Sequence, residues 1–132
     1  MMLAMRIVLG ALGLLSLMVA ARVLADPSAA AVQFGLEVSG ALGQATLRAD
    51  VAALFAVTGG LSVLATLKGD GRSLLGPVCL IGAALAGRLL NLVAAGFTVD
   101  QVAPILIEVV VLAVLFAGFR SLRPVAESAS SV

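Results

Sequence analysis

The sequence predicts an all-α integral membrane protein, folded as an up-down bundle of four helices. Two observations predict this class. Of the 132 residues, 62% are hydrophobic and only 11% are charged, whereas a soluble domain carries about 25% charged residues. In addition, long uncharged runs approach the roughly 20 apolar residues that span a bilayer, namely Ile7–Ala21, Val51–Leu67 and Ser73–Gly87.

Interruptions of the apolar pattern place the helices. Asp26-Pro27-Ser28 ends the first apolar run because proline breaks a helix. The loop at 68–72, with two glycines and three charges, ends the second. The fourth run tolerates Pro104 in its first turn. The sequence therefore predicts one transmembrane domain, residues 1–123, with helices at about 5–25, 46–67, 73–96 and 101–119.

Two segments lie outside these helices. Residues 29–44 form the one sizeable loop, in which a short interfacial helix or strand fits. Residues 124–132 are polar and serine-rich, which predicts a disordered cytoplasmic tail. The first helix can also be read as a signal peptide, because Val23 and Ala25 are small enough for cleavage before Asp26. Arg22 and the length of the run argue against cleavage.

The lysine and arginine residues predict the orientation. Positive charge gathers at one end of the helices, and the opposite end has only Arg22 and Arg48. Loops rich in positive charge face the cytoplasm. We therefore predict a multi-pass protein of the bacterial inner membrane, with both termini in the cytoplasm and the loop at 29–44 in the periplasm. The positive end comprises Arg6, Lys68, Arg72, Arg120 and Arg123.

The residues that the chain lacks exclude several functions. It has no histidine, tryptophan or tyrosine and a single cysteine, Cys79, which we expect to be a buried small hydrophobic residue. Histidine-ligated metal sites, a serine-histidine triad and a cysteine-pair redox centre are therefore excluded. We predict that the chain is not an enzyme and holds no metal or cofactor. Its eight basic residues are scattered, so we also expect no binding of nucleic acid.

Polar residues inside the predicted helices mark a candidate site. A charge near the bilayer centre costs about 2.5 to 3.5 kcal/mol, so it generally faces other helices and finds a partner. Arg88 and Glu108 are equally far in sequence from Thr98, at the turn between the third and fourth helices, so we expect them at one level. Asn91 shares the face of Arg88, and Gln101, Pro104 and Glu108 form a matching stripe on the fourth helix. The candidate polar seam comprises Arg88, Asn91 and Glu108, with Asp50 and Arg48 near the start of the second helix.

Several roles fit this seam. Arg88 and Glu108 can simply lock the bundle, or they can anchor a membrane lipid or another amphipathic small ligand, because arginine binds headgroup oxygens in bidentate geometry. Glu108 and Asp50 lie at different depths and can relay protons in a small proton-coupled transporter or channel subunit. An assembly or accessory subunit, as a homo-oligomer or with another membrane protein, is a further alternative. Ala83 and Gly87 predict close helix packing, first of all within the bundle.

These motifs resemble a known family. Arg48-Ala49-Asp50 at the start of the second helix, Gly87-Arg88 late in the third and Glu108 in the fourth resemble the small bacterial membrane proteins grouped as domain of unknown function 4345. The similarity runs from the first helix to about Phe119. The resemblance implies a four-helix membrane protein and supplies no activity. It also implies aromatic residues near the start of the second helix, where this chain has Phe55 and no tyrosine.

Overall fold

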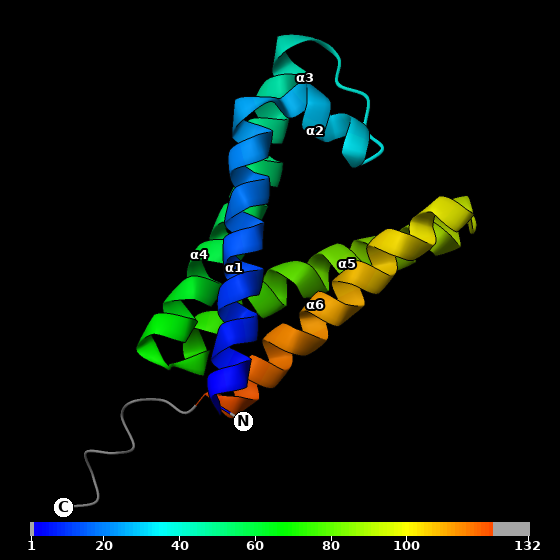
Figure 1. The fold of residues 1–132 in the computed structure, drawn as a ribbon. Helices are drawn as coiled ribbons and strands as arrows, with labels where there is room; N and C mark the ends of the chain where they lie inside the picture. Colours follow the sequence, from blue (N-terminus) through cyan, green and yellow to red (C-terminus); the bar gives the residue numbers. More distant parts are fainter. Residues whose placement is uncertain (1, 123–132) are drawn as a thin grey trace, which may run out of the picture.

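All the regular secondary structure in the part of the chain that the structure describes is helical. The computed structural model describes residues 2–122, and every regular element within this range is a helix (Figure 1). The all-helical prediction is therefore confirmed. The predicted tail at 124–132 lies outside the described residues.

The first helix, α1 (Met2–Ala25), is followed at once by a second, shorter helix. The Asp26 carboxylate accepts a hydrogen bond from the backbone N–H of Ala29 at 3.0 Å and so caps α2 (Pro27–Gln33). Proline suits the first turn of a helix because the N–H that it lacks has no intrahelical partner there. Of the two alternatives for the predicted loop, the helix is the one that forms.

The next helix is longer than the sequence predicts. It begins at Gly40 rather than near residue 46, because Gln44 and Ala45 favour helix even though the surrounding glycines resemble a loop. A five-residue π-helical turn interrupts it. Its parts are α3 (Gly40–Thr46), the π-helical turn η1 (Leu47–Val51) and α4 (Ala52–Lys68).

A tight turn joins α4 to the second half of the chain. Gly69 has a φ of 69°, a left-handed conformation that favours glycine after a helix. The Asp70 carboxylate then accepts a hydrogen bond from the backbone N–H of Arg72 at 2.9 Å. The helices that follow are two 3₁₀ turns and two long α-helices, in the order η2 (Gly71–Leu74), α5 (Leu75–Ala95), η3 (Val99–Gln101) and α6 (Val102–Ser121).

The long helices form two antiparallel hairpins, α1 with α4 and α5 with α6 (Figure 1). The hairpins meet where α1 begins and α6 ends, and they diverge toward the other end. At the junction, Leu9, Leu74 and Leu115 are fully buried. Gly71 lies so close to α6 that a Cβ atom there would be 2.6 Å from the Phe119 carbonyl oxygen. The helices thus alternate in direction, but the hairpins pack against each other at only one end.

Small residues bring two helices together inside the first hairpin. Gly13 of α1 and Gly59 of α4 face each other, and a Cβ atom on Gly59 would lie 2.7 Å from the Gly13 carbonyl oxygen. By contrast, a Cβ atom on Gly87 would meet nothing within 4 Å among the described residues. The prediction that Ala83 and Gly87 pack within the bundle is therefore wrong. Spacing along one helix does not say which face meets a neighbour.

Much of the apolar surface faces outward. Within the described residues, four helices are long and apolar enough to cross a membrane, namely Met2–Ala25, Gly40–Lys68, Gly71–Ala95 and Val99–Ser121. In the most apolar 18-residue stretch of each helix, only 6% of the residues are buried in Gly71–Ala95 and only 11% in Val99–Ser121. These two helices therefore present most of their apolar side chains to the surroundings. Cys79 of α5 is exposed in this way. The expectation that it is buried is wrong, because an apolar stretch need not face the protein core.

Candidate functional site

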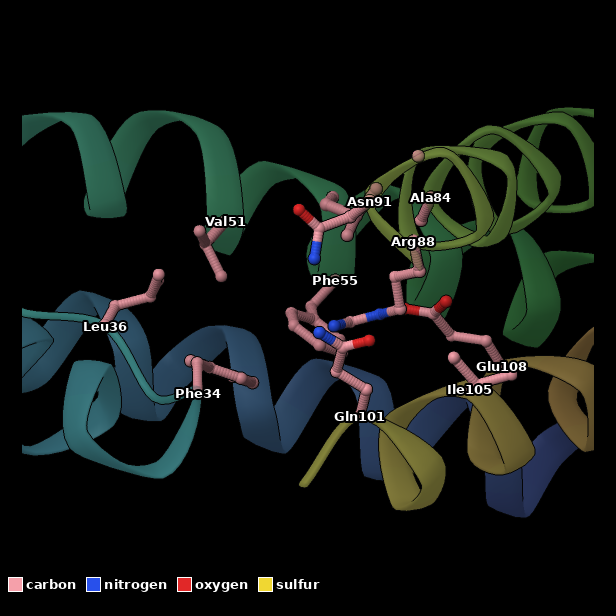
Figure 2. A pocket seen from close by; sticks show the side chains of 12 residues that line it. Phe34, Leu36, Val51, Phe55, Ala84, Arg88, Asn91, Gln101, Ile105 and Glu108 are labelled. Carbon is pink, nitrogen blue, oxygen red and sulfur yellow. The ribbon is translucent and has the colours of Figure 1, made fainter. Parts of the chain in front are cut away.

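A cleft of about 410 Å³ lies between the two hairpins (Figure 2). Its polar side chains come from α5, from η3 and from α6. Its large apolar side chains come mainly from α4 and from the segment that follows α2. The cleft therefore combines both hairpins, and neither hairpin forms it alone. The polar lining residues are Arg88, Asn91, Gln101 and Glu108.

An ion pair occupies the polar side of the cleft. The Arg88 guanidinium donates a hydrogen bond through Nε to Glu108 Oε1 at 2.6 Å. The two residues face each other because they are equally far from the turn at Thr98, as the sequence predicts. The Glu108 side chain is 15% exposed and that of Arg88 is 45% exposed. The carboxylate is thus largely enclosed, whereas part of the guanidinium remains free to contact another molecule.

Among the described residues, two acceptor oxygens of side chains that line the cleft lack a hydrogen-bond partner. Within residues 2–122, no donor reaches Glu108 Oε2 or Gln101 Oε1, although both atoms are buried. A buried polar atom without a partner costs about 1 to 3 kcal/mol. Gln101 ends η3, and Glu108 lies about two helical turns further along. The polar side of the cleft is therefore incompletely satisfied by the protein itself.

Aromatic side chains form the opposite side of the cleft. The Phe34 ring, just after α2, stacks on the Phe55 ring of α4 with centroids 5.8 Å apart and planes at 23°. Leu36 and Val51 extend this apolar surface (Figure 2). The sequence did not predict this aromatic side of the cleft, because the hydropathy pattern does not show that the segment after α2 approaches α5 and α6. The apolar residues of that predicted loop were the available signal.

Asn91 lies beside the ion pair. It follows Arg88 by three residues on α5 and lines the same cleft (Figure 2). The structure therefore brings together three of the five residues in the predicted seam, Arg88, Asn91 and Glu108. Gln101, which the sequence places on the same stripe as Glu108, also lines the cleft.

The other two residues of the predicted seam lie apart from the cleft. Arg48 and Asp50 belong to the π-helical turn η1, and both are exposed. Arg48 donates a hydrogen bond through Nε to the Leu24 carbonyl oxygen at 3.1 Å, which ties η1 to the end of α1. Neither residue lines the cleft. The sequence could not reveal this, because a π-helical turn changes which side of the helix each residue faces.

The cleft offers hydrogen bonding and apolar contact rather than metal coordination. No group of three or more acidic, histidine or cysteine side chains within the described residues is arranged to hold a metal ion. Searches against protein-family models, curated proteins and solved structures find no match to the chain. The resemblance to domain of unknown function 4345 therefore stays a prediction.

Proposed function

We propose that this chain is an integral protein of the bacterial inner membrane that binds an amphipathic, lipid-like small molecule between its two hairpins. The observation that carries the proposal is the cleft of about 410 Å³, in which a polar side faces an aromatic one. Ligand pockets of this kind are mostly apolar, with a few polar groups that fix orientation. A headgroup would contact Arg88, Asn91 and Gln101, and an apolar chain would contact Phe34 and Phe55.

The proposed membrane setting rests on the four long apolar helices and on the charge distribution. In an up-down arrangement of four spans, one end, where the hairpins meet, carries Arg6, Lys68, Arg72 and Arg120, and the opposite end carries Arg22 and Arg48. The end where the hairpins meet would face the cytoplasm. The cleft lies nearer the turns at the other ends of the hairpins, so in this orientation it would lie toward the periplasmic side.

Ligand binding is favoured over transport by the way the hairpins meet. A transported proton or solute would have to pass from the cleft to the opposite end of the molecule. Between these points the apolar side chains of Leu9, Leu74 and Leu115 are packed and fully buried. The buried polar side chains of the described residues are the hydroxyls of Ser16, Thr58 and Ser62, and none of them is an acidic or histidine residue of the kind that forms proton relays in membranes. The cleft therefore suits retention of a molecule better than its passage.

Native mass spectrometry of the full chain, extracted in a mild detergent, tests the proposal. We expect a retained lipid-like ligand in the wild type and its loss in Arg88→Met, with the helical content preserved. Arg22→Ala is the matched control, because Arg22 is an exposed arginine outside the cleft. Equal ligand occupancy in the wild type and in Arg88→Met would contradict the proposal and leave the ion pair a purely structural lock.

A further inference from the structure

The polar atoms that the cleft offers to a ligand are mainly hydrogen-bond donors. This step rests on the proposed function, since it concerns the molecule that the cleft would hold. The acceptor oxygens Glu108 Oε2 and Gln101 Oε1 are buried, so a ligand in the cleft does not reach them. The amide nitrogen of Gln101 also has no hydrogen-bond partner among the described residues, but it is not buried. Gln101 therefore presents its N–H groups to the cleft.

Arg88 and Asn91 contribute further donors. The Arg88 guanidinium donates to Glu108 through Nε, and within residues 2–122 its two terminal nitrogens donate to no other group. The Arg88 side chain is 45% exposed and lines the cleft. Arginine is a donor only, and the exposed Asn91 amide donates as well as accepts. Acceptor oxygens of a ligand can thus bind here while the bond between Arg88 and Glu108 stays in place.

The charges beside these donors cancel. Among the described residues, the charged side chains that line the cleft are Arg88 and Glu108, and they are in contact. An anionic headgroup drawn to Arg88 would also approach the Glu108 carboxylate, and like charges at short range repel each other where water is scarce. An uncharged group with acceptor oxygens, such as a carbonyl, meets no such repulsion.

The opposite side of the cleft suits a flat ring. The rings of Phe34 and Phe55 stack with their planes at 23° to each other, and Phe34 remains 38% exposed. A further planar ring can extend this stack in the offset geometry that aromatic pairs prefer. A ligand with carbonyl oxygens on a planar ring would therefore use both sides of the cleft at once.

We infer that the ligand of this cleft is a quinone, which combines an uncharged planar ring, carbonyl oxygens and an apolar tail. The carbonyl oxygens accept hydrogen bonds from Arg88 and from the amides of Asn91 and Gln101. The ring and the start of the tail contact Phe34 and Phe55. The inference concerns binding of the ring, with no change in its oxidation state.

A quinone and its reduced form test this inference, because the carbonyl groups of the first are hydroxyl groups in the second. The full chain in a mild detergent is mixed under argon with decylubiquinone or with decylubiquinol, in separate samples of equal concentration, and is analysed by native mass spectrometry. The ring of decylubiquinone is fully substituted, so it does not add to the exposed thiol of Cys79. We expect retention of the quinone to exceed that of the quinol roughly two- to tenfold, the equivalent of one hydrogen bond.

A variant then tests the donors on α5. Asn91→Leu removes the amide at an exposed position and keeps a side chain of similar size, so we expect it to lower retention of decylubiquinone roughly two- to tenfold. Gln44→Leu is the matched control, since it replaces an amide on α3 outside the cleft and should leave retention unchanged.

The outcomes separate the inference from the proposed function. Equal retention of the two probes, or preferential retention of the quinol, would overturn the inference. Retention of the quinone that Asn91→Leu leaves unchanged would also overturn it, because the donors of the cleft would then select nothing. If neither probe is retained while a lipid is carried through purification, the inference fails and lipid binding stands. If no probe and no lipid are retained, both fail.

Discussion

Breaking the ion pair from one side should destabilise the fold more than removing it entirely. Removal of one partner of a fully buried pair costs about 3 to 5 kcal/mol, whereas exposed pairs contribute at most about 1 kcal/mol. The pair here lies between these limits, with Glu108 15% exposed and Arg88 45% exposed. We therefore expect Arg88→Met to lower the free energy of unfolding by about 2 kcal/mol, because the enclosed Glu108 carboxylate loses its one partner among the described residues.

Replacing Glu108 should lower the free energy of unfolding less than replacing Arg88 does. In Glu108→Met the Arg88 guanidinium can turn toward water or lipid headgroups, so we expect a loss of about 1 kcal/mol. The double variant, with methionine at both positions, leaves no unpaired charge and should lie within about 1 kcal/mol of the wild type. The expected coupling energy between the two sites is then about 2 to 4 kcal/mol.

Unfolding by sodium dodecyl sulfate in mixed micelles, followed by far-ultraviolet circular dichroism, measures all four proteins of this double-mutant cycle. Additive effects of the two single variants would refute the reasoning, since the pair would then contribute no interaction energy. A double variant that retains stability but loses its ligand would show that the pair is needed for binding rather than for folding.

Three further predictions follow from the packing, the aromatic wall and the charge distribution. Gly59→Ala should destabilise the α1–α4 hairpin by about 1 to 3 kcal/mol through overpacking, whereas Gly60→Ala, with open space around it, should be neutral or stabilising in the same unfolding assay. Phe55→Ala should reduce ligand retention in native mass spectrometry, and Phe97→Ala, which changes an exposed ring outside the cleft, should not. The predicted orientation can be tested with single cysteines in a variant that lacks Cys79, labelled in intact cells with a membrane-impermeant maleimide. Lys68→Cys should not react, whereas a cysteine between α2 and α3 should. The reverse pattern would contradict the prediction that both termini are cytoplasmic.

The all-helical fold and the equal depth of Arg88 and Glu108 were predictable, because each depends only on the order of residues along the helices. Hydropathy marks apolar segments whatever their neighbours are, and a constant rise per residue places Arg88 opposite Glu108 across a hairpin. The same reasoning placed the start of the second helix too late, since Gly40 and Gly43 resemble a loop when no tertiary contact is considered. The residue at which a helix begins or ends depends on whether helix or loop is more stable there, and amino-acid composition predicts this poorly.

The sequence could not show which residues line the cleft or which glycines pack against a neighbouring helix. Both depend on how the helices are placed in space. Gly59 and Gly87 look alike in an apolar run, yet only the first meets a neighbouring backbone. Asp50 looked like a candidate because it is a charge near an apolar segment, and the π-helical turn leaves it exposed and away from the cleft. The sequence also could not show that the side-chain amide oxygen of Gln101 is buried without a hydrogen-bond partner among the described residues.

The divergence of the two hairpins has a consequence for how a ligand would arrive. If the four long helices cross the bilayer as proposed, the cleft between the hairpins would border the lipid leaflet. An amphiphile would then enter sideways, with its chain already in hydrocarbon and only its polar end changing partners. Its uptake would depend on its abundance in that leaflet and on lateral diffusion, and its solubility in water would not limit the rate.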